Sequence, residues 1–427
     1  MADSVARGTL INLVTRLAGV ALVLAITAIT ARIGTETQGA FALFTSIEGV
    51  LLALLSGFGI ALARRVSHHG EQPRALVSAT VLACVGLGVL AGLGLWAVSA
   101  YGPPAYQWLW LLALGAPALL LAPNLQGLWL GEGRMAPMAR LTLAPPAISL
   151  LLLGLLALLA APTLPAVLAS WVVAKVAVGV LAVALLWRGA RLAAPDFGAL
   201  RAELPFIATI GLTNLVGLLN YRVGLFVIER LLGLSQTGIY SIAIVVAELL
   251  WFVSGSLTQA VYGRIGTPDR EHAAATTVRV VQLGVAALVG VAPLLWIAAT
   301  VLVPWVLGPA YAASLPLMAL LLPGVLLFGG ASALSAYFTN HAGLPRVPAQ
   351  VAATSLALNA ALALLLVPRL GMAGAAIAAS LSYAASVLLL AWRFARHAGW
   401  PLRRVLLPGA QLAADLRGVA CRRGGRS

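Results

Sequence analysis

The chain has 427 residues, of which 61% are hydrophobic and 9% are charged. A soluble domain has about 45–50% apolar and about 25% charged residues, so this composition excludes a water-soluble protein. The net charge of +15 would suit a nucleic acid only if basic residues gathered on one face; they lie in short loops instead, so we expect no nucleic-acid partner.

The apolar residues form long blocks, and each block can cross a hydrocarbon layer of about 30 Å as a helix. Segments of about ten residues with alternating polarity, typical of membrane β-barrels, do not occur. The pattern therefore predicts an all-α polytopic membrane protein with about twelve transmembrane helices. In chain order they are expected at residues 9–31, 40–63, 75–101, 106–130, 141–161, 164–187, 205–232, 240–262, 280–302, 315–338, 351–367 and 372–392.

The two halves of the chain resemble each other. The matching positions are Gly39 and Gly238, Trp96 and Trp296, Pro117 and Pro323, Ser149 and Ser355, and Pro162 and Pro368. Because an even number of helices separates the copies, the repeats are parallel and related by an axis along the membrane normal. We expect two six-helix lobes around a central cavity. The predicted parts are an N-terminal lobe (1–187), a cytoplasmic linker (188–204), a C-terminal lobe (205–396) and a basic cytoplasmic tail (397–427).

The orientation follows from the basic residues, because cytoplasmic loops accumulate Arg and Lys. Most of the 27 basic residues fall on one side of the predicted helices, including those at 64–74, 188–201, 264–279 and in the tail. This distribution predicts that both termini are cytoplasmic. The expected location is the inner (cytoplasmic) membrane.

Several classes of function lack the residues they need. The single lysine, Lys175, is not preceded by a Gly-rich phosphate-binding loop, so ATP hydrolysis is not expected. The short outer loops contain Glu36 but no His or Asp, which disfavours a membrane-embedded enzyme. Cys84 lies in an apolar block and Cys421 in the tail, so neither belongs to a metal-ligand pattern. We expect neither a metal nor a cofactor.

Ionisable residues inside transmembrane helices are costly to bury, so each is a candidate functional residue. Counted from the outer turns at about 1.5 Å per residue, Arg222 and Glu248 lie about 20 and 19 Å deep and can face each other. Glu48 and Lys175 both lie about 18 Å deep, in the same layer. The candidates for substrate binding are Arg222, Lys175, Arg16, Asn214 and Asn220, and those for ion coupling are Glu48 and Glu248.

Each candidate also has a structural interpretation. Arg222 and Glu248 could neutralise each other and hold two helices together. Glu48 has no basic partner at its own level in helix 1, so it could be a protonated, buried carboxyl group. Lys175 could snorkel or be neutral, and Arg16 could anchor the first helix at the lipid headgroups. The asparagines could join helices through hydrogen bonds.

Two stretches of the chain resemble a known family. The run 219–224 (Leu-Asn-Tyr-Arg-Val-Gly), with Gly233, Gly238 and Ala247-Glu248, is similar to helices 7 and 8 of Wzx-type polysaccharide flippases of the multidrug/oligosaccharidyl-lipid/polysaccharide (MOP) exporter superfamily. Arg16 with 32–34 and 39–41 is similar to the first two helices of that family. One position departs from the pattern, because Gly224 stands where many relatives have an acidic residue.

This resemblance implies a flippase that moves an undecaprenyl-pyrophosphate-linked oligosaccharide outward by alternating access, for polysaccharide biosynthesis. It implies a cationic cavity, membrane lipids as surroundings, protons or cations as coupling ions, and other polysaccharide-assembly membrane proteins as partners. The alternatives are an ion-coupled exporter of the multidrug-and-toxin type, a lipid II flippase and a non-transporting scaffold of a glycan-assembly complex. The first is disfavoured because helix 1 has Arg16 and no acid, and the second because lipid II flippases usually have fourteen helices.

Overall fold

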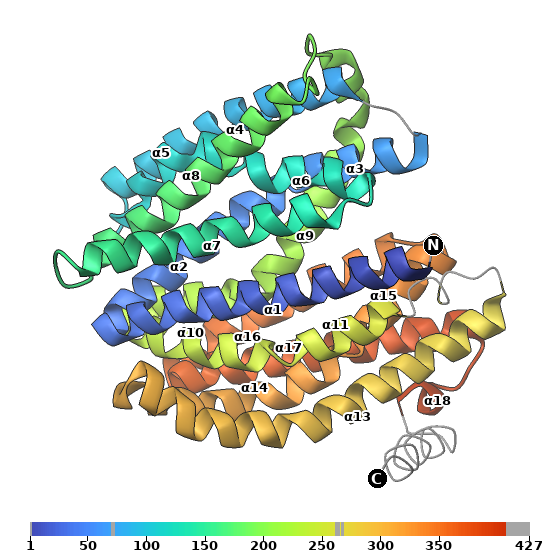
Figure 1. The fold of residues 1–427 in the computed structure, drawn as a ribbon. Coiled ribbons are helices and arrows are strands. Elements are labelled where there is room, and N and C mark those ends of the chain that lie inside the picture. The colour runs from blue at the N-terminus through green and yellow to red at the C-terminus, as the bar shows by residue number, and fades with distance from the viewer. Residues whose placement is uncertain (1, 70–72, 261–264, 266–268, 407–427) are drawn as a thin grey trace, which may run out of the picture. The chain divides into compact units, whose positions relative to one another are not determined.

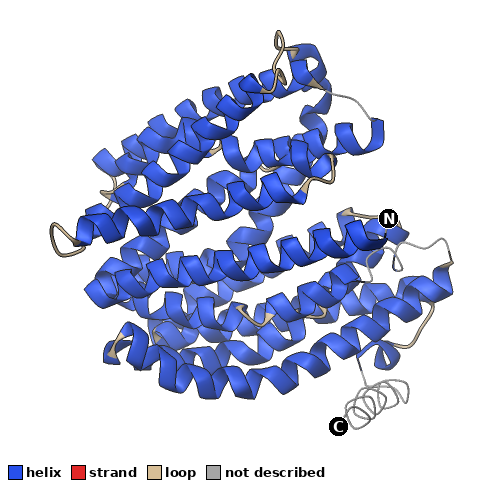
Figure 2. Cartoon of the chain, in the orientation of Figure 1, coloured by secondary structure: helices blue, strands red, loops and turns tan. Residues whose placement is uncertain are grey.

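The computed structural model describes residues 2–69, 73–260, 265 and 269–406, and within these ranges the chain is helical and contains no β-strand (Figure 2). The predicted tail at 397–427 therefore lies mostly outside the described residues, as do residues 264 and 266–268 of the basic stretch at 264–279. The α-helices of the N-terminal half are α1 (Ala2–Ile33), α2 (Thr35–Leu55), α3 (Gly57–His69), α4 (Arg74–Tyr101), α5 (Leu109–Leu119), α6 (Leu121–Gly131), α7 (Met135–Ala157) and α8 (Leu164–Arg188). Those of the C-terminal half are α9 (Phe197–Leu232), α10 (Leu234–Glu248), α11 (Trp251–Ala260), α13 (Arg270–Leu302), α14 (Ser314–Phe328), α15 (Ala331–Ala336), α16 (Arg346–Leu370), α17 (Met372–Ala398) and α18 (Leu402–Leu406).

Twelve helical stretches of the described chain are long and apolar enough to cross a membrane. They confirm the predicted all-α, twelve-helix membrane protein. The stretches are Val14–Ile33, Thr35–Ser67, Arg74–Tyr101, Pro104–Gly131, Met135–Ala157, Leu164–Arg188, Phe197–Leu232, Leu234–Thr258, Arg270–Leu307, Pro309–Thr339, Arg346–Leu370 and Met372–Ala398. The predicted start of the seventh helix at 205 was wrong, because Asp196 accepts a hydrogen bond from the Ala199 backbone N–H (2.9 Å) and caps a helix that begins at Phe197.

The structure supports the sequence repeat at matched positions. Ser149 of α7 hydrogen-bonds Ser170 of α8 (Oγ to Oγ, 3.2 Å), and Ser355 of α16 donates to the Ser382 carbonyl of α17 (3.2 Å). The two repeat serines therefore join the fifth to the sixth and the eleventh to the twelfth transmembrane stretch. Such hydrogen bonds between helices are typical of membrane bundles.

Pro117 and Pro323 mark the second matched feature, an interruption of the fourth and tenth transmembrane stretches. A proline lacks the N–H that would complete the helical hydrogen-bond ladder, so it weakens the helix that contains it. In the N-terminal half α5 ends at Leu119, shortly after Pro117. In the C-terminal half α14 ends at Phe328, shortly after Pro323.

The described chain divides into two compact units. Unit 1 comprises Met1–Leu218 and Gly233–Gly238, and unit 2 comprises Leu219–Leu232 and Ile239–Ser427. The boundary between them falls inside α9. The predicted division at 188–204 stays a prediction.

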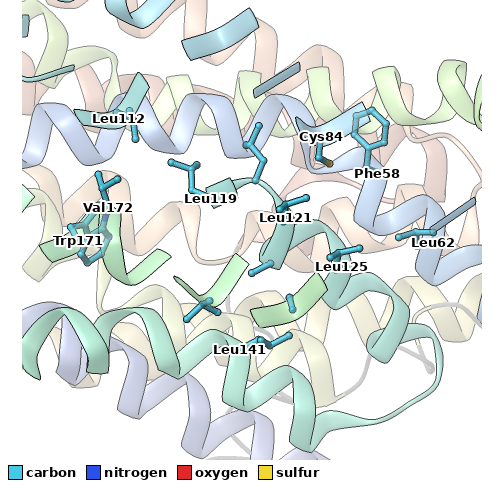
Figure 3. Close-up of a cluster of buried hydrophobic side chains, with 14 of the residues drawn as sticks. Phe58, Leu62, Cys84, Leu112, Leu119, Leu121, Leu125, Leu141, Trp171 and Val172 are labelled. Carbon is cyan, nitrogen blue, oxygen red and sulfur yellow. The ribbon is translucent and has the colours of Figure 1, made fainter. Parts of the chain in front are cut away.

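Unit 1 has a continuous core of leucine, alanine and aromatic side chains. Figure 3 shows a part of this core, where Phe58 and Leu62 of α3 lie near Cys84 of α4. Leu112 of α5 and Trp171 of α8 belong to the same cluster. α4, α5 and α8 run side by side in this unit (Figure 1). The second core, in unit 2, surrounds Phe394 of α17, a helix that packs against α14 and α16.

The repeat glycines Gly39 and Gly238 meet within unit 1. A Cβ atom on Gly39 would overlap the Leu234 backbone carbonyl, and one on Gly238 would overlap the Thr35 backbone carbonyl. Beside this contact the hydroxyl groups of Thr35 and Ser235 lie 2.7 Å apart. Small residues let helix backbones approach this closely in membrane proteins, which explains why both copies of the repeat have glycine here.

We predict that Gly39→Ala lowers the free energy of unfolding by about 1–3 kcal/mol, because the new methyl group must push two backbones apart. Thermal unfolding of the purified protein checks this. Gly94→Ala in α4 is the matched control, since its Cβ would meet nothing within 4 Å. Equal unfolding temperatures for the two variants would contradict the close backbone contact.

Candidate functional site

Glu48, Lys175 and Trp171 form a buried polar cluster in unit 1. Glu48 lies in α2 with 2% of its side chain exposed, and the Lys175 Nζ atom forms an ion pair with its Oε1 atom. The indole N–H of Trp171 donates to the other carboxylate oxygen, Oε2, at 2.7 Å. Both carboxylate oxygens therefore have partners, as a buried charge requires.

Trp171 and Lys175 are neighbours on one face of α8, because residues four apart in a helix lie above each other. The Lys175 Nζ atom lies 4.3 Å from the centroid of the Trp171 ring, within the range of a cation–π interaction. Phe41 of α2 packs edge-on against the same ring, with centroids 5.5 Å apart. The tryptophan thus orients both charged groups, which restricts the cluster to one geometry.

The contact corrects two structural expectations. Glu48 has no level basic partner in the first helix, but Lys175 of the sixth transmembrane stretch supplies one. The Lys175 Nζ atom contacts Glu48, so the side chain does not snorkel toward the headgroups. Sequence reasoning missed Trp171, although its spacing of four residues from Lys175 was a signal that could have found it.

Arg222 and Glu248 form a second ion pair, in unit 2. The two guanidinium nitrogens of Arg222 donate to the two carboxylate oxygens of Glu248 at 3.4 and 3.2 Å, so the contact is bidentate. About a fifth of each side chain is exposed, 23% and 20%. The predicted contact between these residues is confirmed. A bidentate arginine pair fixes direction as well as charge.

Glu248 is the last residue of α10. The next residues, Leu249 and Leu250, donate backbone hydrogen bonds three positions back rather than four, and α11 then begins at Trp251. The carboxylate therefore lies where the helix tightens into a short 3₁₀ turn. Such mid-helix interruptions often mark functional sites in transporters.

The packing around Gly224 explains why this position has glycine where many relatives have an acidic residue. A Cβ atom at this position would lie 3.0 Å from the hydroxyl oxygen of Tyr240 and 3.5 Å from the Ala375 side chain. Tyr240 is almost completely buried in α10, and its ring uses the space that a larger residue at 224 would need. A larger residue at position 224 would require Tyr240 to shift by a few tenths of an ångström.

The remaining predicted site residues are Asn220, Asn214 and Arg16. Asn220 is buried, accepts from Ser355 (3.3 Å), and its backbone carbonyl accepts from Asn359 (2.8 Å), so its contacts join α9 to α16. Asn214 is exposed and donates to the Ser56 hydroxyl at 2.8 Å. Arg16 is exposed on α1. Within the described ranges no three His, Cys, Asp or Glu side chains form a group that could hold a metal ion.

The fold has solved counterparts. An inward-facing multidrug resistance transporter of the MATE family, in the MOP superfamily, matches with a TM-score of 0.70 at 14% identity, over 91% of this chain and 98% of that chain. The MATE multidrug transporter DinF-BH, solved with a bound ligand, matches with a TM-score of 0.68 at 14% identity, over 96% and 97% of the two chains. The chain has the MATE transporter fold. No protein-family model matches the sequence, and a search of curated proteins finds no match.

A third counterpart is a MOP superfamily transporter from Pyrococcus furiosus, described as having a binding pocket of reverse polarity that suggests a different function. It matches with a TM-score of 0.62 at 14% identity, over 93% of this chain and 95% of that chain. These structural neighbours are transporters. At such low identity the likeness establishes the fold and leaves the cargo open.

Proposed function

We propose that this chain is an ion-coupled transporter of the MATE type, which moves an amphipathic solute across a membrane by alternating access. Two ion pairs within the transmembrane stretches support this proposal, one in each compact unit. The observation that carries it is Glu48, a carboxylate with 2% exposure whose two oxygens contact Lys175 and Trp171. Buried charges of this kind are expensive in a membrane and typically belong to ion or substrate pathways.

Protonation of the two ion pairs could couple proton movement to transport. A proton that binds Glu48 cancels its negative charge and thereby releases the Lys175 ammonium group from its partner. The same reaction at Glu248 releases the Arg222 guanidinium group. Each protonation therefore exchanges a neutral ion pair for a free cation, which changes both the charge of the site and the contacts between its helices.

The first candidate cargo is an organic cation. The fold likeness favours this candidate, since two of the matched proteins are described as multidrug transporters. Efflux of a fluorescent organic cation from proteoliposomes, driven by a pH gradient, tests it. We expect gradient-dependent efflux that Glu48→Gln lowers at least tenfold; gradient-independent leakage equal to that of protein-free liposomes would contradict this candidate.

The second candidate is a lipid-linked oligosaccharide on an undecaprenyl-pyrophosphate carrier. One observation favours it: the mid-stretch acids Glu48 and Glu248 already have basic partners, so an organic cation would have to displace Lys175 or Arg222. A pyrophosphate would instead pair with the released cations, and a guanidinium group binds phosphate oxygens in the same bidentate manner as carboxylate. Flipping of a fluorescent carrier-linked disaccharide in the same proteoliposomes distinguishes the two cargoes.

We propose that the protein lies in the cytoplasmic membrane with both termini in the cytoplasm. We predict that a cysteine in place of Glu36 reacts with an impermeant thiol reagent added outside, whereas one in place of Ser67 does not, because the latter lies beside Arg64 and Arg65. The background is Cys84→Ala with Cys421→Ser, which removes both native thiols. Labelling of Ser67→Cys from outside in intact cells would reverse the orientation.

A further inference from the structure

Four aromatic rings pack together in unit 2, next to the Arg222–Glu248 pair. Tyr221 precedes Arg222 in α9, and its ring centroid lies 5.0 Å from that of Trp251 in α11. Phe328 at the end of α14 lies 5.3 Å from Trp251 and 5.1 Å from Tyr383 of α17. The rings are tilted or edge-on to one another, the arrangement that aromatic quadrupoles prefer. α11, α14 and α17, which carry three of these rings, are labelled in Figure 1.

This aromatic cluster forms one wall of a cavity of about 260 Å³. Three of its rings line the cavity, together with three serine hydroxyl groups and two glycines that leave space. The lining residues are Tyr221, Trp251, Ser254, Gly255, Phe328, Gly329, Ser332 and Ser335. None of them is charged. Pockets for drug-sized ligands have about 300–1,000 Å³, so this cavity has room for a single small ring.

We infer that this cavity binds one neutral pyranose ring of a glycan. A pyranose has an apolar C–H face that stacks on an aromatic ring and an edge of hydroxyl groups that hydrogen-bond with serine. The cavity offers both kinds of surface and no charge. An organic cation would also be attracted to the rings, but the lining includes no carboxylate to neutralise it.

A second cavity has a different lining. It has about 670 Å³ and lies in unit 1, where its lining comprises Trp96, Trp110 and apolar or small residues, with no hydroxyl group. Trp96, Leu114 and other lining side chains are exposed. The lining of this second cavity suits an apolar ligand such as a hydrocarbon chain. The cavity in unit 2 combines rings with hydroxyl groups, and this combination is what a sugar needs.

The inference rests on the second candidate of the proposed function, and it places the sugar-binding contacts beside the cation that would hold a pyrophosphate. Arg222 directly follows Tyr221, and Trp251 lies three positions after Glu248. On α9, the ring of Tyr221 and the ion-pair residue Arg222 are therefore adjacent. Across the turn between α10 and α11, the ion-pair residue Glu248 and the ring of Trp251 are close in the same way. One ligand with a charged group and a sugar could use both.

The test measures binding of free methyl glycosides of glucose, galactose and N-acetylglucosamine to the full chain. The protein is held in lipid nanodiscs without glycolipid or glycoside detergent, because detergent sugars would compete. Saturation-transfer NMR reports which ring protons touch the protein. We expect dissociation constants of about 1 mM, usual for so small a ligand, with transfer strongest at the apolar C–H face.

Gly255→Val is the decisive variant. Gly255 lines the cavity and a Cβ at this position meets nothing within 4 Å, so we expect the valine side chain to fill part of the cavity. We expect it to weaken glycoside binding at least tenfold while the unfolding temperature stays close to that of the control Gly94→Val, a helical glycine with equally open surroundings. Ser332→Ala tests the hydroxyl wall, with an expected loss of about threefold.

Absence of saturation transfer to every glycoside would overturn the inference. So would glycoside binding that Gly255→Val leaves unchanged, or a Gly255→Val protein that loses the binding of an organic cation but keeps the binding of the glycosides. Binding is measured without a gradient, so it is independent of transport. A protein that binds glycosides through this cavity but moves neither cargo would refute the proposed transport and keep the subsite. A protein that flips the carrier-linked sugar without such binding would refute the subsite and keep the proposed transport.

Discussion

Lys175→Met is expected to reduce the yield of folded protein severely. The substitution keeps the length of the side chain but leaves the Glu48 carboxylate, with 2% exposure, without its cation. Removing one partner of a buried ion pair typically costs about 3–5 kcal/mol, because the other charge remains buried. Such a loss is a large fraction of the stability of most proteins. Folded yield after size-exclusion chromatography and the thermal unfolding temperature measure the effect.

The double variant Glu48→Gln with Lys175→Met is the control. Neither residue is then charged, and the glutamine carbonyl can still accept the hydrogen bond that Trp171 donates at 2.7 Å to Glu48. We expect most of the lost yield and unfolding temperature to return, since a buried pair replaced as a unit is often neutral for stability. A Lys175→Met protein as stable as the unmodified chain would show that Glu48 does not depend on Lys175.

Arg222→Gln is expected to insert and fold but to transport its cargo at least tenfold more slowly. The Arg222–Glu248 pair is about a fifth exposed, so the carboxylate left behind reaches water or a proton more easily than Glu48 does. The loss of stability is therefore smaller than for Lys175→Met. Transport falls because glutamine cannot replace the bidentate contact of the guanidinium group with Glu248 or, for the second proposed cargo, with a pyrophosphate.

Two further variants separate pairing from cargo binding. Arg222→Lys should recover transport only in part, because an ammonium group is a point charge that cannot reproduce a bidentate contact. The charge swap Arg222→Glu with Glu248→Arg should keep the ion pair and the fold but not restore transport, since the cation then projects from α10 rather than α9. Expression and transport are measured on the same preparations. A well-folded Arg222→Gln protein with the normal transport rate would remove Arg222 from the site.

The twelve transmembrane stretches were predictable because membrane helices carry their signal in composition and length alone. The start of α9 was not, since Arg191, Arg201 and Glu203 made the region before Pro205 read as a polar linker. The structure extends the helix through Glu203, which is buried and accepts a hydrogen bond from Arg65 at 2.8 Å. Hydropathy cannot show that a charged residue has found a partner on another helix.

The same limit applies to the candidate site. Counting depth along each helix placed Arg222 and Glu248 at one level, and their helices are consecutive, so their contact could be predicted. Glu48 and Lys175 also shared a level, but they lie on the second and sixth transmembrane stretches. Depth fixes neither the rotation of a helix nor its neighbours, so this pair and the role of Trp171 required the structure. The turn that ends α10 at Glu248 contains two leucines, Leu249 and Leu250, and carries no Gly or Pro signal.

The central claim is that the ion pairs couple transport to ions, and the double variant Glu48→Gln with Lys175→Met tests it most directly. Luminal pH is recorded in proteoliposomes while a fluorescent organic cation or a carrier-linked disaccharide moves. The account predicts that the unmodified protein moves protons in step with one of these cargoes, and that the folded double variant moves protons at least tenfold more slowly, because only the Glu248–Arg222 pair then remains. Proton-coupled transport at the full rate in the double variant would contradict the account.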